Sequence, residues 1–150
     1  AQTGKILELK KRVLESHTLE AVLSMPDELF FPIGVVSCIM VFTAKRSPPK
    51  NKKTFFGYFK DDGFVKRKNR GRINAYGKWE SIKENWISAY INKEDIAGFS
   101  VNKIVNADDE WCAEAYMETD YSNLLKKDFE QNILDFVAYK ISNSKINRDE

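Results

Sequence analysis

The segment that most restricts the fold of this chain is residues 35–43, VVSCIMVFT, which are almost all apolar. Most of them are β-branched or aromatic, and such residues favour strands. A run of nine such residues suits a strand that is covered on both faces. We therefore predict a buried strand here, at the centre of a single α/β domain.

Three further segments carry apolar residues at the intervals of an amphipathic helix. These predicted helices are residues 5–17, 78–92 and 124–141. The second of them presents Trp79, Trp86 and Tyr90 on one face. Either these rings pack in the core or they stack on bases, and we favour core packing.

Other segments of the chain have the pattern of strands. Residues 18–25, TLEAVLSM, place Leu19, Ala21 and Leu23 on one side of an extended run that a proline ends. The aromatic segment 54–60, TFFGYFK, predicts another strand, and residues 98–105 predict a short one. Between the first of these strands and the 35–43 run lies the sequence PDELFFPIG, which we interpret as a binding loop.

Charge is strongly segregated along the chain, although the net charge is only +2. Residues 45–78 contain 12 Lys and Arg against two acids, a balance of +10, whereas the rest of the chain carries 12 basic and 20 acidic residues, a balance of −8. Such asymmetry indicates either a contact for a polyanion or a solvated loop. The densest part of this basic segment, and our predicted set of DNA-binding residues, is Lys66, Arg67, Lys68, Arg70 and Arg72.

Several kinds of chemistry lack the residues that they need. Cys38 and Cys112 have no partner at metal-ligand spacing, so we expect free thiols in a reducing cytoplasm and no metal site. A single histidine, His17, leaves almost no material for a His-based triad. Apolar runs are too short to cross a membrane, and no glycine-rich phosphate loop or nucleophile elbow occurs. The residues alone indicate a soluble α/β domain with a basic patch and an aromatic loop.

One segment resembles a known family. Residues 17–42, HTLEAVLSMPDELFFPIGVVSCIMVF, are similar to the stretch that follows the Asn-Pro-Pro-aromatic motif in the modification subunits of type I restriction systems, which are adenine-specific (N-6) DNA methyltransferases. Residues 53–72 and 108–121 resemble later parts of the same family. The last of these segments, DDEWCAEAYMETDY, departs from the Asn-Asp-Tyr-x-Leu sequence that many members carry there.

The resemblance implies a fold and a domain organisation. Residues 1–64 would be the C-terminal end of a Rossmann-like methyltransferase sheet, with residues 18–25 as its sixth strand and residues 35–43 as the antiparallel seventh strand beside the fifth. Residues 65–150 would be a mixed α+β extension with a basic loop and a C-terminal helix. Removal of the other strands would expose a sheet edge, which allows pairing with another copy.

The resemblance also implies an activity and its partners. The cofactor is S-adenosylmethionine, the substrate is double-stranded DNA, and the partner is a DNA-specificity subunit. Whether a restriction subunit binds as well is left open. No Asn-Pro-Pro sequence and no cofactor glycine motif occurs here, so we expect both to lie upstream in the parent enzyme. We therefore expect no catalytic residue in this chain and no activity of the chain by itself.

In the family, the loop between the sixth and seventh strands supplies an aromatic ring that stacks on the flipped-out adenine. Phe31, which precedes Pro32, fits the family pattern best, and Phe30 would then pack at the base of the loop. In the alternative interpretation both rings only plug the end of the sheet.

Two other classes of function fit the residues. The chain could be a non-catalytic module that binds nucleic acid through the basic segment 45–78, or a scaffold that docks a partner through the helix at residues 78–92. The sequence upstream of Ala1 in the parent protein would distinguish these classes from a methyltransferase.

Overall fold

The computed structural model describes residues 4–118 and 125–146. The chain divides into two units, Ala1–Thr119 and Asp120–Glu150. Within residues 125–146 the second unit contains the helix α3 (Lys126–Ile146), which confirms the predicted C-terminal helix and extends it by five residues. Leu124, where that prediction began, lies outside the described residues. Across the described residues, no helix combines the length and the apolarity that a bilayer crossing requires.

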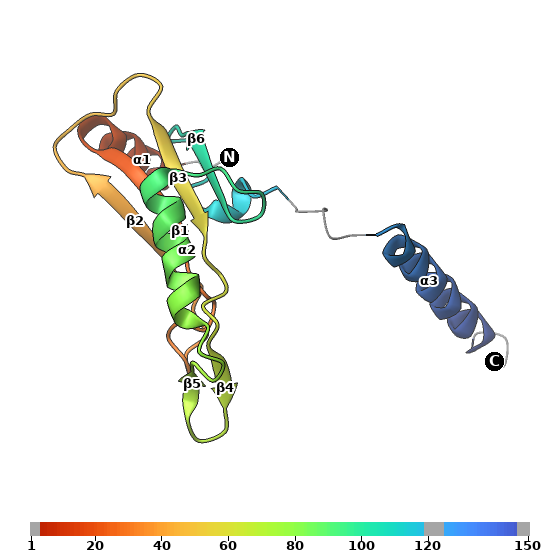
Figure 1. The fold of residues 1–150 in the computed structure, drawn as a ribbon. Coiled ribbons are helices and arrows are strands. Elements are labelled where there is room, and N and C mark those ends of the chain that lie inside the picture. The colour runs from red at the N-terminus through yellow and green to blue at the C-terminus, as the bar shows by residue number, and fades with distance from the viewer. Residues whose placement is uncertain (1–3, 119–124, 147–150) are drawn as a thin grey trace. The chain divides into compact units, whose positions relative to one another are not determined.

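The first unit is built on a mixed sheet of four strands (Figure 1). Its elements are α1 (Lys5–Ser16), β1 (Thr18–Ser24), β2 (Cys38–Thr43), β3 (Lys53–Tyr58), β4 (Val65–Arg67), β5 (Gly71–Ile73), α2 (Trp79–Asn92), β6 (Ser100–Ile104) and the short 3-10 helix η1 (Ala113–Ala115). The strand order is β2-β1-β3-β6, in which only β1 and β3 are parallel. Strands β4 and β5 form a separate antiparallel hairpin. The predicted α/β class is confirmed.

The core lies on both faces of β1 and β3. The buried side chains on one face are Leu19, Val22, Phe56 and Ala113. Those on the other face are Ala21, Phe55, Phe59 and Ala89. The pairing of β1 with β2 shifts between Leu19 and Ala21, and this bulge turns the two side chains to opposite faces. The prediction that Leu19, Ala21 and Leu23 share one side is therefore wrong for Leu19, whereas Ala21 and Leu23 do pack on the same face.

Strand β2 lies at the edge of the sheet and is not covered on both faces. Ile39 and Met40 are 47% and 41% exposed, and the strand begins at Cys38, three residues later than its apolar run does. The predicted strand exists, but its predicted burial is wrong for this chain. An apolar sequence shows that a strand can be buried; it does not show which element covers it.

The aromatic face of α2 packs in the core, as we favoured. The rings of Trp86 and Phe59 stack with their centroids 4.8 Å apart and their planes at 6°. Trp79 meets Trp86 edge to face at 5.4 Å. These contacts hold α2 against the face of the sheet that carries Phe55.

A glycine in β3 makes room for this packing. A Cβ atom on Gly57 would lie 2.8 Å from the Phe59 ring and 3.1 Å from a Leu23 methyl group. Gly34, in the loop before β2, has open space where its own Cβ atom would lie. The two glycines therefore form a matched pair for a stability test.

We expect Gly57→Ala to lower the free energy of unfolding by about 1 to 3 kcal/mol, the usual cost of overpacking a core. Gly34→Ala should change it by less than about 0.5 kcal/mol, as at most exposed positions. Urea unfolding of the two variants beside the parent chain measures both effects. Equal stability of the two variants would contradict the packing role of Gly57.

Candidate functional site

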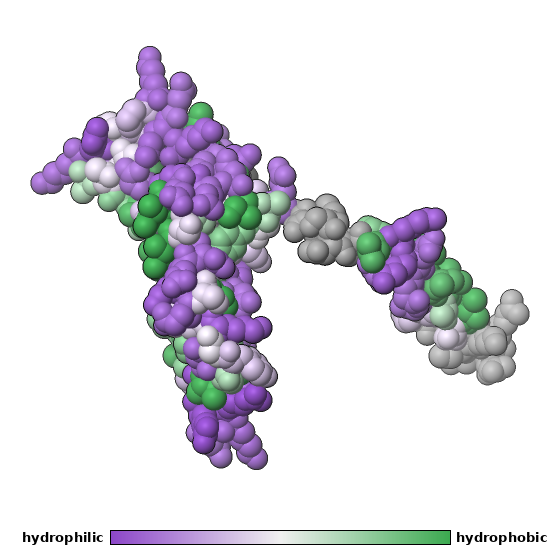
Figure 2. Space-filling view, in the orientation of Figure 1, coloured by the Kyte–Doolittle hydropathy of each residue, from purple (hydrophilic) through white to green (hydrophobic). Residues whose placement is uncertain are grey.

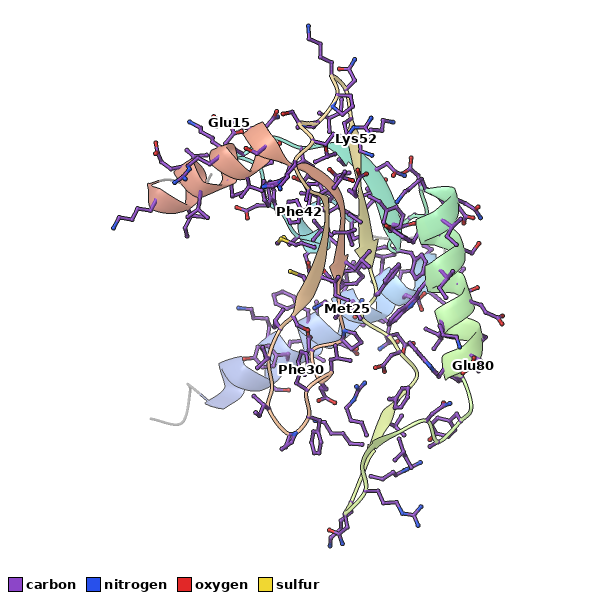
Figure 3. All side chains as sticks on the ribbon, turned by 90° about the vertical axis from the view of Figure 1, so that its left-hand side faces the viewer. Glu15, Met25, Phe30, Phe42, Lys52 and Glu80 are labelled. Carbon is purple, nitrogen blue, oxygen red and sulfur yellow. The ribbon has the colours of Figure 1, made fainter. Side chains whose placement is uncertain are left out.

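Two segments of interest leave the sheet at the same end. Because β1 and β3 are parallel, the loop after β1 and the chain after β3 both emerge at the carboxyl ends of these strands. The first is the aromatic loop (residues 26–34), and the second leads to the β4–β5 hairpin, which we call the basic hairpin (residues 65–73). Figure 3 shows Phe30 at this end, whereas Glu15 and Lys52 lie at the opposite end.

The aromatic loop contacts the basic hairpin through Phe31. The Lys66 ammonium group lies 5.5 Å from the centroid of this ring and forms an ion pair with Glu28 of the loop. A Cβ atom on Gly71 of β5 would lie 3.8 Å from the same ring. Phe31 therefore lies against both strands of the hairpin, and the two segments share one surface.

The two phenylalanines of the loop differ in their surroundings. Phe30 is 57% exposed and Phe31 is 43% exposed. The expectation that Phe30 packs at the base of the loop is wrong, because its ring is the more exposed of the two. The exposure of both rings also argues against the alternative in which they only plug the end of the sheet.

A buried ion pair anchors the hairpin. The Arg72 guanidinium donates to both carboxylate oxygens of Asp62 at 2.6 and 2.8 Å, and the two side chains are only 12% and 8% exposed. The same carboxylate accepts a hydrogen bond from the backbone N–H of Phe64. Breaking a buried pair leaves an uncompensated charge, which costs about 3 to 5 kcal/mol. Arg72 therefore holds the hairpin in place.

The predicted DNA-binding residues thus occupy different positions. Arg72 is paired in the interior, and Lys66 is exposed but paired with Glu28. The exposed basic side chains at the tip are Arg67, Lys68 and Arg70. Figure 2 shows hydrophilic side chains over this end of the first unit.

The basic run was predicted as a loop and is a hairpin instead. Each of its strands has three residues, too few to show the alternation by which a strand is predicted. Asn69 and Gly71 have positive φ angles of 61° and 69°, which form the turn between the strands.

The fold also splits the basic segment 45–78 between the two ends of the sheet. Residues 44–52 connect β2 to β3 at the end opposite the aromatic loop, where Figure 3 shows Lys52. There Lys52 pairs with Glu20 at 2.5 Å, and the hydroxyl of Thr18 donates to the carbonyl oxygen of Arg46. The charge of +10 is therefore not one continuous footprint.

A polar network at the end of β1 fixes the start of the aromatic loop. The Lys60 ammonium group lies 2.6 Å from Asp27 of the loop and 3.1 Å from Glu114. Ser24 donates a hydrogen bond of 2.6 Å to the other oxygen of Glu114. Sequence analysis missed this network because its partners are 33 to 90 residues apart.

The network favours the charged forms of Glu114 and Lys60. Burial of Glu114 opposes ionisation, but the hydrogen bonds from Ser24 and Lys60 outweigh it, so the pKa of this carboxyl lies below its ordinary value. Burial of Lys60 likewise opposes its charge, and hydrogen bonds to Asp27 and Glu114 raise the pKa of the ammonium group above its ordinary value. The loop is therefore held by charges that persist at neutral pH.

Residues 108–118 close one face of the sheet. The indole N–H of Trp111 donates to the carbonyl oxygen of Asn106 at 3.0 Å, and its ring lies 6.3 Å from that of Phe42. Lys10 of α1 lies 4.7 Å from the centroid of the same indole. The last residues of the segment that resembles the family, 119–121, lie outside the described residues.

Two features of the described residues bear on a metal or S-adenosylmethionine site. No group of three or more His, Cys, Asp or Glu side chains is placed to hold a metal ion anywhere in residues 4–118 and 125–146. Gly57 and Gly63 have side chains where a Cβ would stand, those of Phe59 and Ile82, and so they do not line an open cradle.

Comparison with known proteins shows which family and which proteins this chain is similar to. The family model described as N-6 DNA Methylase matches residues 1–141. The type II restriction enzyme and methyltransferase RM.BcgI of Heyndrickxia coagulans is 34% identical over 112 residues, which are 74% of this chain and 17% of that protein. The methylase subunit of the type I restriction enzyme MjaVII of Methanocaldococcus jannaschii is 29% identical over 97 residues, which are 65% of this chain and 16% of that subunit.

The matched part thus spans less than a fifth of the length of either relative. Within this chain the family model covers both the aromatic loop and the basic hairpin. The resemblance of residues 17–42 to N-6 methyltransferases is confirmed, and the chain belongs to the N-6 DNA methylase family.

Proposed function

We propose that this chain is part of an adenine-specific DNA methyltransferase, which transfers a methyl group from S-adenosylmethionine to the amino group of an adenine extruded from the duplex. The observation that carries the proposal is the aromatic loop beside a basic hairpin, in a chain of the N-6 DNA methylase family. An enzyme of this kind must extrude the base, because the amino group is unreachable inside the stack.

In this proposal residues 1–64 are the last strands of a Rossmann-like sheet and residues 65–150 are an extension, whose strand β6 joins the same sheet beside β3. Strand β1 is the sixth strand, and β2 is the antiparallel seventh strand beside the fifth. Two features support this assignment: β2 runs antiparallel to β1, and its other edge has no partner among the strands described for residues 4–118. The isolated chain would then be inactive, and its open edge could pair with another copy.

The partners follow from the same proposal. S-adenosylmethionine supplies the methyl group and is held by other parts of the whole protein. Double-stranded DNA is the substrate, and a separate DNA-specificity subunit selects the site in a type I arrangement. The name of the relative from Methanocaldococcus jannaschii, a methylase subunit of a type I enzyme, supports this arrangement. A restriction subunit is a further partner in such a complex.

The residues of this chain orient the target base in the proposed reaction. Phe31 stacks on the extruded adenine, and Lys60 and Asp27 hold the loop that carries it. Phe31 is the first choice because it already adjoins the basic hairpin, where the DNA backbone would lie. Phe30 is the alternative because its ring is more exposed.

We expect Phe31→Ala in the whole enzyme to slow methylation by roughly 5- to 150-fold at equal cofactor occupancy. Loss of a base–aromatic stack is worth about 1 to 3 kcal/mol, and about 1.4 kcal/mol is a factor of ten in rate. Phe31→Trp should restore most of the rate. Single-turnover methylation measures this, and 2-aminopurine at the target position should fluoresce more brightly without the ring.

Phe30→Ala is the matched control for this experiment. A defect in Phe30→Ala and none in Phe31→Ala would exchange the roles of the two rings. Wild-type rates for both alanine variants would show that the loop does not hold the base.

Neutralising the exposed tip of the hairpin should weaken the salt dependence of DNA binding. With Arg67, Lys68 and Arg70 replaced by Gln, the slope of log affinity against log salt should flatten by about two to three units, because each phosphate contact contributes about 0.9. The control replaces Lys45, Arg46 and Lys50 at the opposite end and should leave the slope unchanged. An unchanged slope in the tip variant would mean that the hairpin is solvated or contacts a protein partner.

A further inference from the structure

We propose that the basic hairpin enters the major groove of the duplex beside the target adenine and contacts base edges there, in addition to phosphates. The inference rests on the proposed function and adds to it a second element of sequence recognition within the methylase chain. It follows from the reach of the hairpin, the chemistry of its tip and its attachment to the aromatic loop.

The hairpin has the size that the groove requires. A major groove about 12 Å wide and about 8.5 Å deep admits a two-stranded β-ribbon. The rung that joins Lys66 and Arg72 is anchored to the body by Glu28 and Asp62. Asn69 lies three residues beyond this rung, which is at most about 10 Å at about 3.3 Å per residue, because residues 68–70 form the turn. The tip can therefore reach the floor of the groove while its base stays on the protein.

The tip also carries side chains that read bases. An arginine fork fits the O6 and N7 atoms of guanine, and an asparagine amide fits the N6 and N7 atoms of adenine. Arg70 and Asn69 are both exposed at the turn. Turn geometry accounts for Asn69, which has a φ angle of 61°, but it does not require the basic residues on either side of it.

The hairpin is rigid enough for its tip to be aimed. Besides the buried Arg72–Asp62 pair, the Arg67 guanidinium donates to the Tyr76 hydroxyl at 3.3 Å and lies 6.0 Å from that ring. A ribbon held in this way loses little further freedom when it binds.

Contact with the aromatic loop fixes the position of the hairpin tip relative to the target base. Phe31 lies against Gly71 of β5 and under Lys66 of β4. The proposed stacking ring and the reading tip therefore belong to one assembly, and extrusion of the adenine against the ring places the tip on a neighbouring base pair.

The test separates groove contacts from phosphate contacts in the whole enzyme. Duplexes that carry the enzyme's own methylation site are made with 7-deazaguanine or 7-deazaadenine at each flanking position, which removes the N7 acceptor and leaves every phosphate unchanged. Binding of these duplexes is compared for the wild type, for Arg70→Lys and Asn69→Ala, and for Arg46→Lys at the opposite end of the sheet as the control.

We expect one flanking substitution to weaken wild-type binding by roughly 2- to 12-fold, because it removes one of the two hydrogen bonds of a bidentate base contact. Asn69→Ala should abolish this discrimination at an adenine, and Arg70→Lys, which loses the planar fork, should weaken it at a guanine, whereas Arg46→Lys should retain it. The salt slope of Arg70→Lys should equal that of the wild type, because the charge is kept.

Discrimination that is the same in the wild type and in both tip variants would overturn the proposal, because another part of the enzyme would then read the base. Absence of discrimination at every flanking position would overturn it as well. An enzyme that methylates no adenine in any duplex would instead refute the proposed function, so the two failures are distinguishable.

Discussion

The parallel pairing of β1 with β3 is the constraint on which the rest of the structure depends. Ala21 pairs with Phe55 and Val22 with Phe56, and all four side chains are fully buried. Because parallel strands end at the same edge, the pairing brings the aromatic loop and the basic hairpin together from segments that are far apart in the sequence. Antiparallel pairing would place them at opposite ends. The candidate site is thus a consequence of the sheet, and its loops can vary while the sheet positions them.

Polar contacts then fix what the sheet brings together. Exposed ion pairs such as Lys66–Glu28 contribute little to stability, usually less than about 1 kcal/mol. The buried pair of Arg72 with Asp62 is different, because loss of either partner leaves a charge in the interior. It is therefore the pair that decides where the basic hairpin lies. Charge in this chain thus attaches the hairpin, and contact with a polyanion is the role that we propose for the exposed charges at its tip.

Sequence reasoning succeeded where one short segment determines its own conformation. The helices α1, α2 and α3 and the strands β1 and β3 follow from periodicity and from β-branched or aromatic residues. It failed where the outcome depends on contacts distant in sequence: the exposure of β2, the bulge after Leu19, and the burial of Arg72. The exposed Phe30 and the partners of Lys60 were missed for the same reason. Composition identified the basic patch, but only tertiary structure shows which of its charges are available.

The central claim is that the aromatic loop and the basic hairpin form one DNA-facing site. Photocrosslinking tests it most directly, with 5-iodouracil at the target position of a duplex bound to the whole enzyme and the attached peptides identified by mass spectrometry. The account predicts crosslinks to residues 26–34 from the target position, and to residues 65–73 when the probe is moved to the flanking base pair. Crosslinks that fall only on other parts of the enzyme, or on the basic residues 44–52 at the opposite end of the sheet, would contradict it.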